Sequence, residues 1–213
     1  MLSLDPFYPI VPDTAWLERL LPQGIKLVQL RIKNAAPDAL EAEISRALEH
    51  CASYDCQLVV NDYWREAIAA GADFVHLGQD DLKAADLTSI RKAGMRIGIS
   101  THSEDELATA LRSDPDYVAL GPIYPTKLKA MPWAPQGLER IEQWRRRIAC
   151  PLVAIGGITL DRVAGVLAAG ADSAAVITDI VTSEDPERQI QNWLRATQPW
   201  RDLSTGLVKP GAA

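Results

Sequence analysis

Short apolar runs alternate with longer amphipathic stretches along the chain. Most of these runs are continuously apolar, and each ends at a polar residue or a glycine. Strands that are buried on both faces have this pattern, as in a parallel sheet covered by helices. The pattern predicts eight strands, at residues 7–11, 26–31, 57–61, 74–77, 96–100, 117–121, 151–155 and 173–177.

The longer stretches repeat their apolar residues at helical spacing. Leu40, Ile44 and Leu48, for example, lie on one face of a helix. Ser103 and Glu106 form the Ser-x-x-Glu pattern that caps the start of a helix. Six helices are predicted, at residues 37–53, 82–93, 103–113, 137–148, 160–169 and 186–196.

The spacing of the strands distinguishes two architectures. Strand ends recur about every 24 residues between Ile10 and Ile177, which predicts a small parallel eight-stranded (β/α)8 TIM barrel with short loops. An open doubly wound sheet is the alternative, but it usually has fewer strands, and no GxGxxG motif opens a helix here. We expect one barrel domain over residues 1–198 and a C-terminal tail over residues 199–213.

Composition and charge narrow the class of protein. Of the 213 residues, 47% are hydrophobic and 23% are charged, which excludes a disordered chain or a coiled coil. The net charge of −6 argues against non-specific binding of nucleic acid. Neither a signal peptide nor an apolar run of the ~18 residues that span a membrane is present. We therefore expect a soluble, cytoplasmic protein that binds neither nucleic acid nor membrane.

Cysteine and tryptophan add two expectations. Cys51, Cys56 and Cys150 are odd in number and form no CxxC pair, so reduced, buried thiols are expected rather than redox chemistry. The six tryptophans, among them Trp193 and Trp200, can either seed an interface between copies of the chain or pack internally. A homo-oligomer is therefore left open.

In a barrel of this kind the chemistry gathers where the strands end. Gln29, Arg31 and Lys33 alternate with Leu30 and Ile32 at the end of the second strand, so the first three share one face. An arginine and a lysine on one face form a clamp for an anion. The alternative is a pair of surface cations, but the strand before them is apolar.

Carboxylates follow the next two strands. Asp62 comes after Asn61 at the end of the third strand, and Asp81 lies in the loop after the fourth. Carboxylates on neighbouring loops can converge on Mg²⁺, which often takes one or two of them and leaves its other positions to water and phosphate. Asp81 is equally a candidate N-cap for the helix predicted from Leu82.

The remaining strand ends hold a second candidate site. Gly157 after the seventh strand and Thr178 after the eighth predict the phosphate cradle that is typical of these barrels. Residues 126–136 have neither strand nor helix pattern and are a candidate lid. His102, after the fifth strand, is more typical of a loop or cap residue than of a general base. Two anionic groups fit this face, which indicates a reaction that joins or splits two phosphorylated molecules.

Six motifs, in this order and spacing, resemble the thiamine-phosphate synthase family over about residues 26–180. They are Gln29-Leu30-Arg31-Ile32-Lys33, Asn61-Asp62-Tyr63-Trp64 and the segments 75–82, 98–102, 119–126 and 153–158. The resemblance implies a (β/α)8 enzyme that joins 4-amino-2-methyl-5-hydroxymethylpyrimidine diphosphate to a thiazole phosphate and releases pyrophosphate.

Carried over by position, the resemblance implies three groups of site residues. The pyrimidine diphosphate would be held by Gln29, Leu30, Arg31, Ile32, Lys33, Asn61, Ser100 and Lys129. Mg²⁺ would be held by Asp62 and Asp81. The thiazole phosphate would be held by Thr126, Lys127, Leu128, Gly157, Ile177 and Thr178. The catalytic residues would be Arg31, Lys33, Ser100 and Lys129.

The implied reaction is dissociative. The bond to the leaving pyrophosphate ionises, and the thiazole nitrogen attacks the resulting pyrimidine-methyl cation. Such a reaction needs two things: the negative charge on the leaving group must be neutralised, and water must be kept away from the cation. A strong base matters less. Mg²⁺ and the cations Arg31, Lys33 and Lys129 would supply the first, and the loop after Thr126 the second.

Two departures and two alternatives qualify the resemblance. Leu128 stands where the family usually has threonine, so a side-chain hydroxyl is lost, whereas Thr178 keeps the hydroxyl of the usual serine.

A thiazole tautomerase is a paralogue with the same barrel and a histidine near position 102, but it tends to lack the acidic loop that Asp81 represents. A non-catalytic phosphate-binding barrel is the other alternative.

Overall fold

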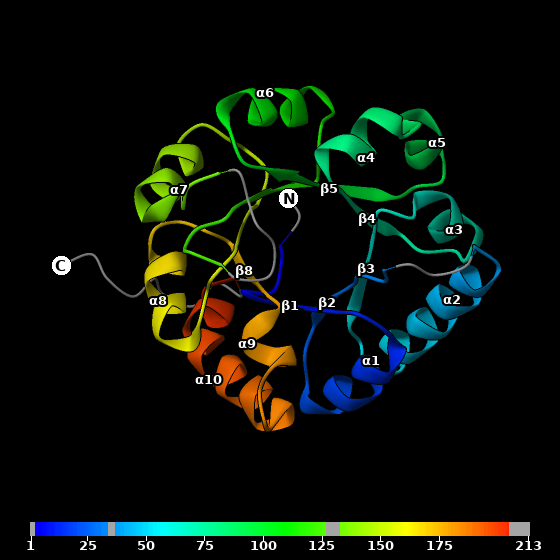
Figure 1. Ribbon diagram of the computed structural model, residues 1–213, viewed down its shortest axis with the longest axis horizontal. Coiled ribbons are helices and arrows are strands. Elements are labelled where there is room, and N and C mark those ends of the chain that lie inside the picture. The colour runs from blue at the N-terminus through cyan, green and yellow to red at the C-terminus, as the bar shows by residue number, and fades with distance from the viewer. Residues whose placement is uncertain (1–2, 34–36, 127–132, 205–213) are drawn as a thin grey trace.

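Eight parallel strands close into a barrel in the computed structural model of the chain (Figure 1). The structure describes residues 3–33, 37–126 and 133–204. Neighbouring strands pair in chain order, and the first strand pairs with the last through Phe7 and Ala174. The predicted (β/α)8 TIM barrel is therefore confirmed.

Each strand lies within one residue of its predicted bounds. Nearly all strand residues are buried, which explains why their sequence pattern is continuous rather than alternating. The strands are β1 Phe7–Val11, β2 Leu27–Leu30, β3 Gln57–Asn61, β4 Phe74–Leu77, β5 Arg96–Thr101, β6 Tyr117–Leu120, β7 Leu152–Ile155 and β8 Ser173–Val176.

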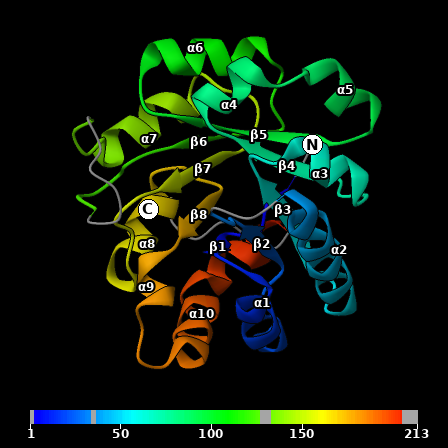
Figure 2. The same ribbon diagram turned by 45° about the vertical axis from the view of Figure 1, so that its right-hand side comes forward.

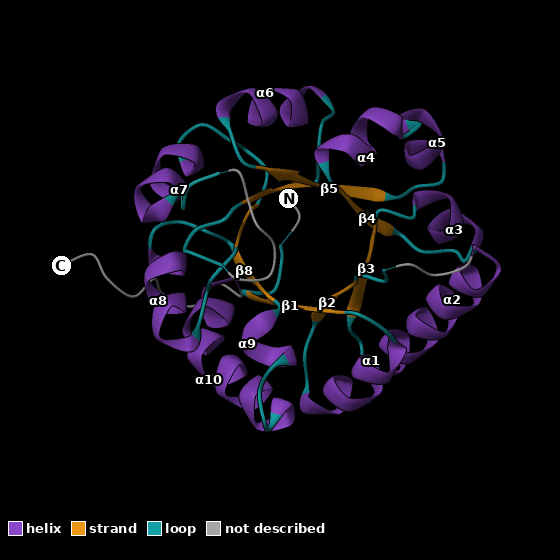
Figure 3. Cartoon of the chain, in the orientation of Figure 1, coloured by secondary structure: helices purple, strands orange, loops and turns teal. Residues whose placement is uncertain are grey.

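Helices surround the barrel as an outer ring (Figures 2 and 3). The short helices α1, α3 and α9 were not predicted, because four to seven residues are too few to show a helical period. The helices are α1 Thr14–Leu20, α2 Pro37–Ser53, α3 Trp64–Ala69, α4 Gln79–Ala84, α5 Leu87–Lys92, α6 Glu104–Arg112, α7 Gly137–Arg145, α8 Leu160–Ala168, α9 Thr178–Val181 and α10 Pro186–Ser204, with the 3-10 turn η1 Leu21–Gln23.

The helix predicted over residues 82–93 is two helices, α4 and α5. The chain breaks between them because Asp86 caps α5, accepting hydrogen bonds from the backbone N–H groups of Thr88 and Ser89 at 3.0 and 3.1 Å. The first helix starts earlier than predicted, with Gly78 at its N-cap position. Asp81 therefore lies inside the first turn of α4, and the N-cap role considered for it is wrong.

Inward and outward strand residues form two separate clusters. Outward residues such as Phe7 and Val11 pack against the helices, whereas Tyr8 and Ile10 fill the barrel interior. The same alternation directs Gln29, His76 and Ser100 inward. The interior cluster consists of Leu4, Tyr8, Ile10, Leu27, Val59, Phe74, Tyr117, Ala119, Val153 and Ala175.

The last helix is longer than predicted. α10 continues through Pro199 to Ser204, so residues 199–204 of the expected tail are helical. Residues 205–213 lie outside the described residues, and the domain boundary at 198 stays a prediction. Trp193 of α10 is fully buried and stacks on Phe7 with ring centroids 5.2 Å apart, so it packs internally.

The structure bears on two further expectations. Cys51 and Cys56 are buried and Cys150 is half-buried, and all three are free thiols, as predicted. Across residues 3–33, 37–126 and 133–204, every helix is too short or too polar to cross a membrane.

A nearly buried ion pair ties α10 to the start of β1. Arg201 Nε and Nη2 donate to the two carboxylate oxygens of Asp5 at 2.6 and 2.8 Å. Asp5 also accepts from the backbone N–H of Phe7 at 2.9 Å. The side chains of Arg201 and Asp5 are only 19% and 9% exposed. A bidentate pair in this setting restrains both ends of the described chain.

Asp5→Asn should lower the free energy of unfolding by about 2 kcal/mol, because Arg201 would keep its buried charge without a counter-charge. Asp55→Asn is the matched control. Asp55 pairs with Lys26 at 3.1 Å but is 97% exposed, so its loss should cost under about 0.5 kcal/mol. Urea unfolding of both variants measures the difference, and equal effects would contradict this role for the Asp5–Arg201 pair.

Candidate active site

Two carboxylates meet at the rim where β3 and β4 end. The Asp62 side chain lies close to Asp81 and accepts a hydrogen bond from Asn61 Nδ2. The backbone N–H of Asp62 donates to the His76 carbonyl at 2.8 Å, which fixes the turn beside β4. Its φ of 67° lies in the left-handed region, which aspartate and asparagine tolerate better than most residues.

The approach of Asp81 depends on a glycine. A Cβ at Gly78 would come within 2.9 Å of Asp81 Oδ2, so the missing side chain leaves room for this carboxylate. Gly78 also precedes α4, whose first turn contains Asp81. The local sequence Gly78-Gln79-Asp80-Asp81 thereby aims one carboxylate at Asp62 and leaves Asp80 exposed.

Burial of the Asp62 carboxyl, followed by the nearby charge of Asp81, raises the pKa of Asp62 to about 6, although Arg31 partly opposes this rise. Asp62 therefore favours its protonated form more than an ordinary aspartate does, and a cation can replace that proton. Among the described residues, no group of three or more His, Cys, Asp or Glu side chains could hold a metal. Two carboxylates suit Mg²⁺, which usually keeps several waters and substrate phosphates as ligands.

Arg31 and Lys33, which were predicted to form an anion clamp, follow the end of β2 at Leu30. Leu30 and Ile32 both pack on the outer cluster, so the predicted alternation of faces continues past the last residue of the strand. The backbone N–H of Arg31 donates to the Val11 carbonyl at 2.8 Å, and the charge of Arg31 acts on the pKa values of both Asp62 and His76. Arg31 therefore lies at the acidic pair, while Lys33 is exposed on the following loop.

Three other predicted ligands of the diphosphate lie on or just after β2. Leu30 belongs to the outer apolar cluster, so its side chain points away from the interior and only its backbone can face a ligand. Gln29 is 2% exposed, and its Nε2 donates to Tyr8 Oη at 3.0 Å. Ile32 is half-buried and packs on the outer cluster.

A buried hydrogen-bond line crosses the barrel interior from Gln29 to Ser100. The hydroxyls of Tyr8 and Tyr117 are 3.1 Å apart, and Tyr117 Oη lies 2.7 Å from His76 Nδ1. His76 Nε2 lies 2.7 Å from Ser100 Oγ, at the rim end of β5. Burial, followed by the nearby charge of Arg31, lowers the pKa of His76 to about 4, so the imidazole is neutral at pH 7.

Sequence reasoning assigned no role to Tyr8, His76 or Tyr117. Their signal is the alternation along β1, β4 and β6, which directs these polar side chains into the interior. Asn61 shares the inward alternation and is buried at the end of β3. In a strand that is apolar on both faces, a single tyrosine or histidine changes the hydrophobic pattern only a little. The sequence therefore does not mark these inward polar residues.

Glycines shape the second candidate site, between β6 and β7. Gly156 and Gly157 have φ values of 98° and 66°, and a Cβ at Gly157 would lie 2.5 Å from the Pro125 carbonyl oxygen. Arg162 Nη1 donates to the Gly157 carbonyl at 2.7 Å, and its guanidinium lies over the Tyr124 ring, 4.6 Å from the centroid. The Gly-Gly turn is therefore held against the loop that follows β6.

The other predicted residues of this second site fall on two elements. Ile177 packs against the interior cluster and is the N-cap residue of α9, and the exposed Thr178 begins that helix. Thr126, after β6, is half-buried. Lys127, Leu128 and Lys129, together with most of the expected lid, lie outside the described residues.

His102 is a loop residue, as expected. Its backbone N–H donates to Glu106 Oε2 at 2.7 Å, and its Nδ1 lies 2.8 Å from the same oxygen. Its ring stacks on Trp133 with centroids 4.1 Å apart, and its carbonyl accepts from Gln136 Nε2 at 2.7 Å. His102 thus links the start of α6 to the segment that leads into α7.

The predicted capping box is confirmed in part, since Ser103 Oγ accepts from the Glu106 N–H at 3.2 Å.

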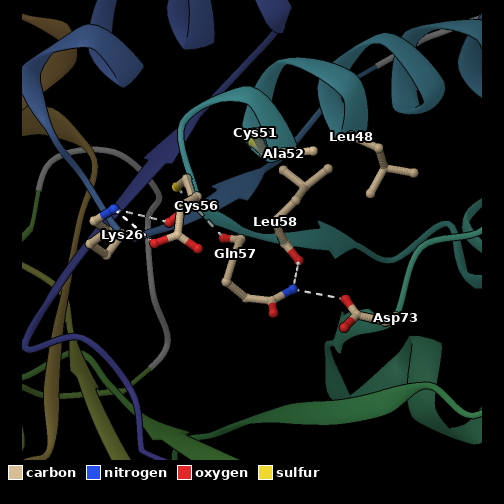
Figure 4. A pocket seen from close by; sticks show the side chains of 9 residues that line it. Lys26, Leu48, Cys51, Ala52, Cys56, Gln57, Leu58 and Asp73 are labelled. Atoms are coloured by element: carbon tan, nitrogen blue, oxygen red, sulfur yellow. Dashed lines mark hydrogen bonds and ion pairs between the residues drawn. The ribbon is translucent and has the colours of Figure 1, made fainter.

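A separate hollow lies at the opposite end of the barrel, near the starts of β2, β3 and β4 (Figure 4). Its polar groups pair with one another: Lys26 bonds Asp55 at 3.1 Å, and Gln57 bonds Asp73 at 2.8 Å. In TIM barrels this end serves stability rather than catalysis. The rim that carries Asp62 and Asp81 is therefore the better candidate for the active site.

Comparisons with known proteins identify the family of the chain. Residues 8–180 match the family model described as thiamine monophosphate synthase. Thiamine-phosphate synthase of Rhizobium etli is 59% identical over 203 residues, which cover 95% of this chain and 100% of that protein. The chain belongs to the thiamine-phosphate synthase family. It is accordingly an enzyme of thiamine biosynthesis, and its reaction class is that of a transferase.

More distant members of the thiamine-phosphate synthase family support the assignment. The enzyme of Yersinia pestis is 48% identical over 200 residues, covering 93% of this chain and 90% of that protein. The solved structure described as thiamine phosphate pyrophosphorylase from Pyrococcus furiosus has a TM-score of 0.80 at 27% identity, covering 92% and 96% of the two chains. These names favour the synthase over the tautomerase alternative.

The raised pKa of Asp62 generates a stability prediction. Because the folded-state pKa is above the ordinary value, the ionised carboxylate destabilises the fold increasingly as the pH rises from about 4 to 6. Asp62→Asn removes this cost and suits the left-handed backbone, so without divalent cations it should add about 1 kcal/mol to the free energy of unfolding at pH 7.5.

Urea unfolding at pH 7.5 and at pH 5 tests this prediction, with EDTA present. The gain should shrink at pH 5, where wild-type Asp62 is largely protonated. Added Mg²⁺ should stabilise the wild type but not the D62N variant. Destabilisation by the substitution at pH 7.5 without metal would contradict the repulsion between Asp62 and Asp81.

Proposed function

We propose that this enzyme catalyses the magnesium-dependent condensation of 4-amino-2-methyl-5-hydroxymethylpyrimidine diphosphate with 4-methyl-5-(2-hydroxyethyl)thiazole phosphate or its 2-carboxy form. The products are thiamine phosphate and pyrophosphate, and the 2-carboxy form would in addition release its carboxyl group as CO2. The family assignment supports the reaction class. The observation that carries the proposal for this site is the convergence of Asp62 and Asp81 at the rim, within the field of Arg31.

The pyrimidine diphosphate occupies the rim over β2–β5 in this proposal. Asp62 and Asp81 hold Mg²⁺, which when bound neutralises part of the charge on the diphosphate. Arg31 binds phosphate oxygens through its planar guanidinium, and Lys33 and Lys129 add point charges. Ser100 and Asn61 contribute polar contacts from the ends of β5 and β3.

Bond cleavage precedes bond formation. The C–O bond between the pyrimidine methylene and the diphosphate breaks, and its electron pair leaves with pyrophosphate. The ring amino group stabilises the resulting cation, and the thiazole nitrogen donates its lone pair to form the new C–N bond. Arg31 and Lys33 stabilise the charge that grows on the leaving group, which is the main requirement of a dissociative reaction. A strong general base is unnecessary, which agrees with the lowered pKa of His76, because a weakly basic imidazole is a poor proton acceptor.

The thiazole phosphate lies over β6–β8 in this proposal. The Gly157 turn and the Thr178 hydroxyl bind the phosphate, with Thr126 and Lys127 beside them and Ile177 against the ring. The loop after Thr126 excludes water from the cation. Since Leu128 has no hydroxyl, we expect a higher KM for thiazole phosphate than in relatives that have threonine there.

We also propose a cytoplasmic location and a single barrel domain with a short C-terminal tail. The three free cysteines support the first, because reduced thiols are typical of a reducing compartment. A homo-oligomer stays a prediction that analytical ultracentrifugation can test.

A coupled assay tests the proposed reaction directly. The enzyme is incubated with both phosphorylated substrates and Mg²⁺, and thiamine phosphate and pyrophosphate are quantified separately. The proposal requires equal amounts of the two products and no product when EDTA replaces Mg²⁺. Isomerisation of the carboxythiazole phosphate without condensation would instead assign the chain to the tautomerase reaction, and binding without turnover would favour the non-catalytic barrel.

Asp81→Asn should lower kcat at least about 100-fold and leave the KM for thiazole phosphate within about two-fold, because it removes one of two proposed metal ligands. Asp80→Asn is the matched control at the adjacent position. Asp80 is 96% exposed and pairs with Lys83 at 3.0 Å, so kcat should not change. Unchanged turnover of the D81N variant would exclude Asp81 as an essential metal ligand.

A further inference from the structure

The hydrogen-bond line in the barrel interior joins side chains of five strands. It runs from Gln29 on β2 through Tyr8 on β1, Tyr117 on β6 and His76 on β4 to Ser100 on β5. Four of the five side chains are buried, and Ser100 is half-buried at the rim. The line therefore leads from a sealed interior to the place where the pyrimidine diphosphate is proposed to bind.

The first donor gives the line a direction. Gln29 Nε2 can only donate, so Tyr8 Oη accepts at this contact. Among the described residues, Tyr117 Oη is the other group that contacts Tyr8 Oη, and Gln29 Nε2 cannot accept, so the buried Tyr8 hydroxyl satisfies its own hydrogen by donating to Tyr117. Tyr117 in turn donates to His76 Nδ1. A neutral imidazole that accepts at Nδ1 carries its hydrogen on Nε2, which donates to Ser100 Oγ. The Ser100 hydroxyl keeps its own hydrogen for a further partner.

We infer that this line holds His76 as the Nε2–H tautomer and thereby presents the Ser100 hydroxyl as a hydrogen-bond donor at the rim. Tyr117 and His76 are positioning residues for the contact between Ser100 and the pyrimidine diphosphate. The inference rests on the proposed function for the identity of this ligand. A donor suits an acceptor-only phosphate oxygen, whereas the reverse direction would turn a serine lone pair toward negative charge.

Burial keeps the members of the line neutral. Desolvation raises the pKa of both tyrosines well above the ordinary value of 10, although the hydrogen bonds that Tyr8 makes with Tyr117 and Gln29 partly oppose this rise for Tyr8. Neither hydroxyl can therefore lose its hydrogen near pH 7. With His76 neutral as well, the number of hydrogens along the line does not change over the working pH range.

A glycine makes the central contact possible. Gly98 lies between His76 and Tyr117 in the strand register, because it pairs with both residues on the neighbouring strands. A Cβ at Gly98 would lie 2.1 Å from the Tyr117 ring. The ring instead crosses this gap and stacks on His76, with centroids 5.5 Å apart and planes inclined by 17°. Stacking and hydrogen bonding together fix the orientation of the imidazole.

The tautomer of His76 is the most direct readout, and it does not depend on turnover. The chain has three histidines, so the ring ¹⁵N resonances of His76 can be assigned by comparison with His76→Gln. In wild-type enzyme at pH 7, the proposal requires a protonated Nε2 and an unprotonated Nδ1. A protonated Nδ1, or a doubly protonated ring, would overturn it.

Tyr117→Phe tests the consequence for binding. It removes the hydroxyl that donates to Nδ1 but retains the ring that stacks on His76. We expect a mixed population of His76 tautomers and a KM for pyrimidine diphosphate about ten-fold higher, with the KM for thiazole phosphate unchanged. Tyr54→Phe is the control, since Tyr54 is 43% exposed and far from this line in the fold.

Tyr8→Phe provides a second variant that leaves the Tyr117 hydroxyl in place. Its effect on the tautomer and on the KM should have the same direction and be smaller. If both variants lose only stability, with the tautomer and both KM values unchanged, the line is structural and the positioning role is wrong. If the wild type shows the expected tautomer but no condensation, the proposed function fails, while the direction of the line is upheld.

Discussion

A closed barrel gives its inward side chains almost no access to water, so every polar atom placed there needs a partner inside the barrel. Among the side chains that the structure describes, no buried nitrogen or oxygen atom lacks a hydrogen-bond partner. Gln29, Tyr8, Tyr117 and His76 meet this requirement by bonding one another in sequence. These hydrogen bonds fix the orientation of the His76 ring. His76 in turn orients the hydroxyl of Ser100, the member of the line that reaches the rim.

The rim combines opposite charges on a protein with a net charge of −6. The negative charge of Asp81 acts on Asp62, and the positive charge of Arg31 acts on Asp62 in the opposite direction. Such an arrangement is costly without a cation and becomes favourable when a cation and an anionic substrate bind together. In the proposed function, the same repulsion that weakens the fold as the pH rises from about 4 to 6 would favour binding of a metal–diphosphate complex.

The strands were predictable because burial on both faces leaves a continuous apolar run, and their ends then indicated Arg31, Asp62 and Gly157 as candidate site residues. The break between α4 and α5 depends on the cap Asp86, and the length of α10 depends on the contact between Arg201 and Asp5, which joins the two ends of the described chain. The roles of Tyr8, Tyr117 and His76 depend on strand register, with Gly98 as the gap between them. Long-range pairing of this kind has no local sequence signature.

A crystal structure of the enzyme with Mg²⁺ and pyrophosphate tests the central claim most directly, because it locates the metal and the leaving group together. The account predicts Mg²⁺ bound by the carboxylates of Asp62 and Asp81, with pyrophosphate contacting Arg31 and the Ser100 hydroxyl. Binding of the metal and pyrophosphate away from the Asp62–Asp81 pair, for example in the hollow beside Lys26 at the opposite end of the barrel, would contradict it.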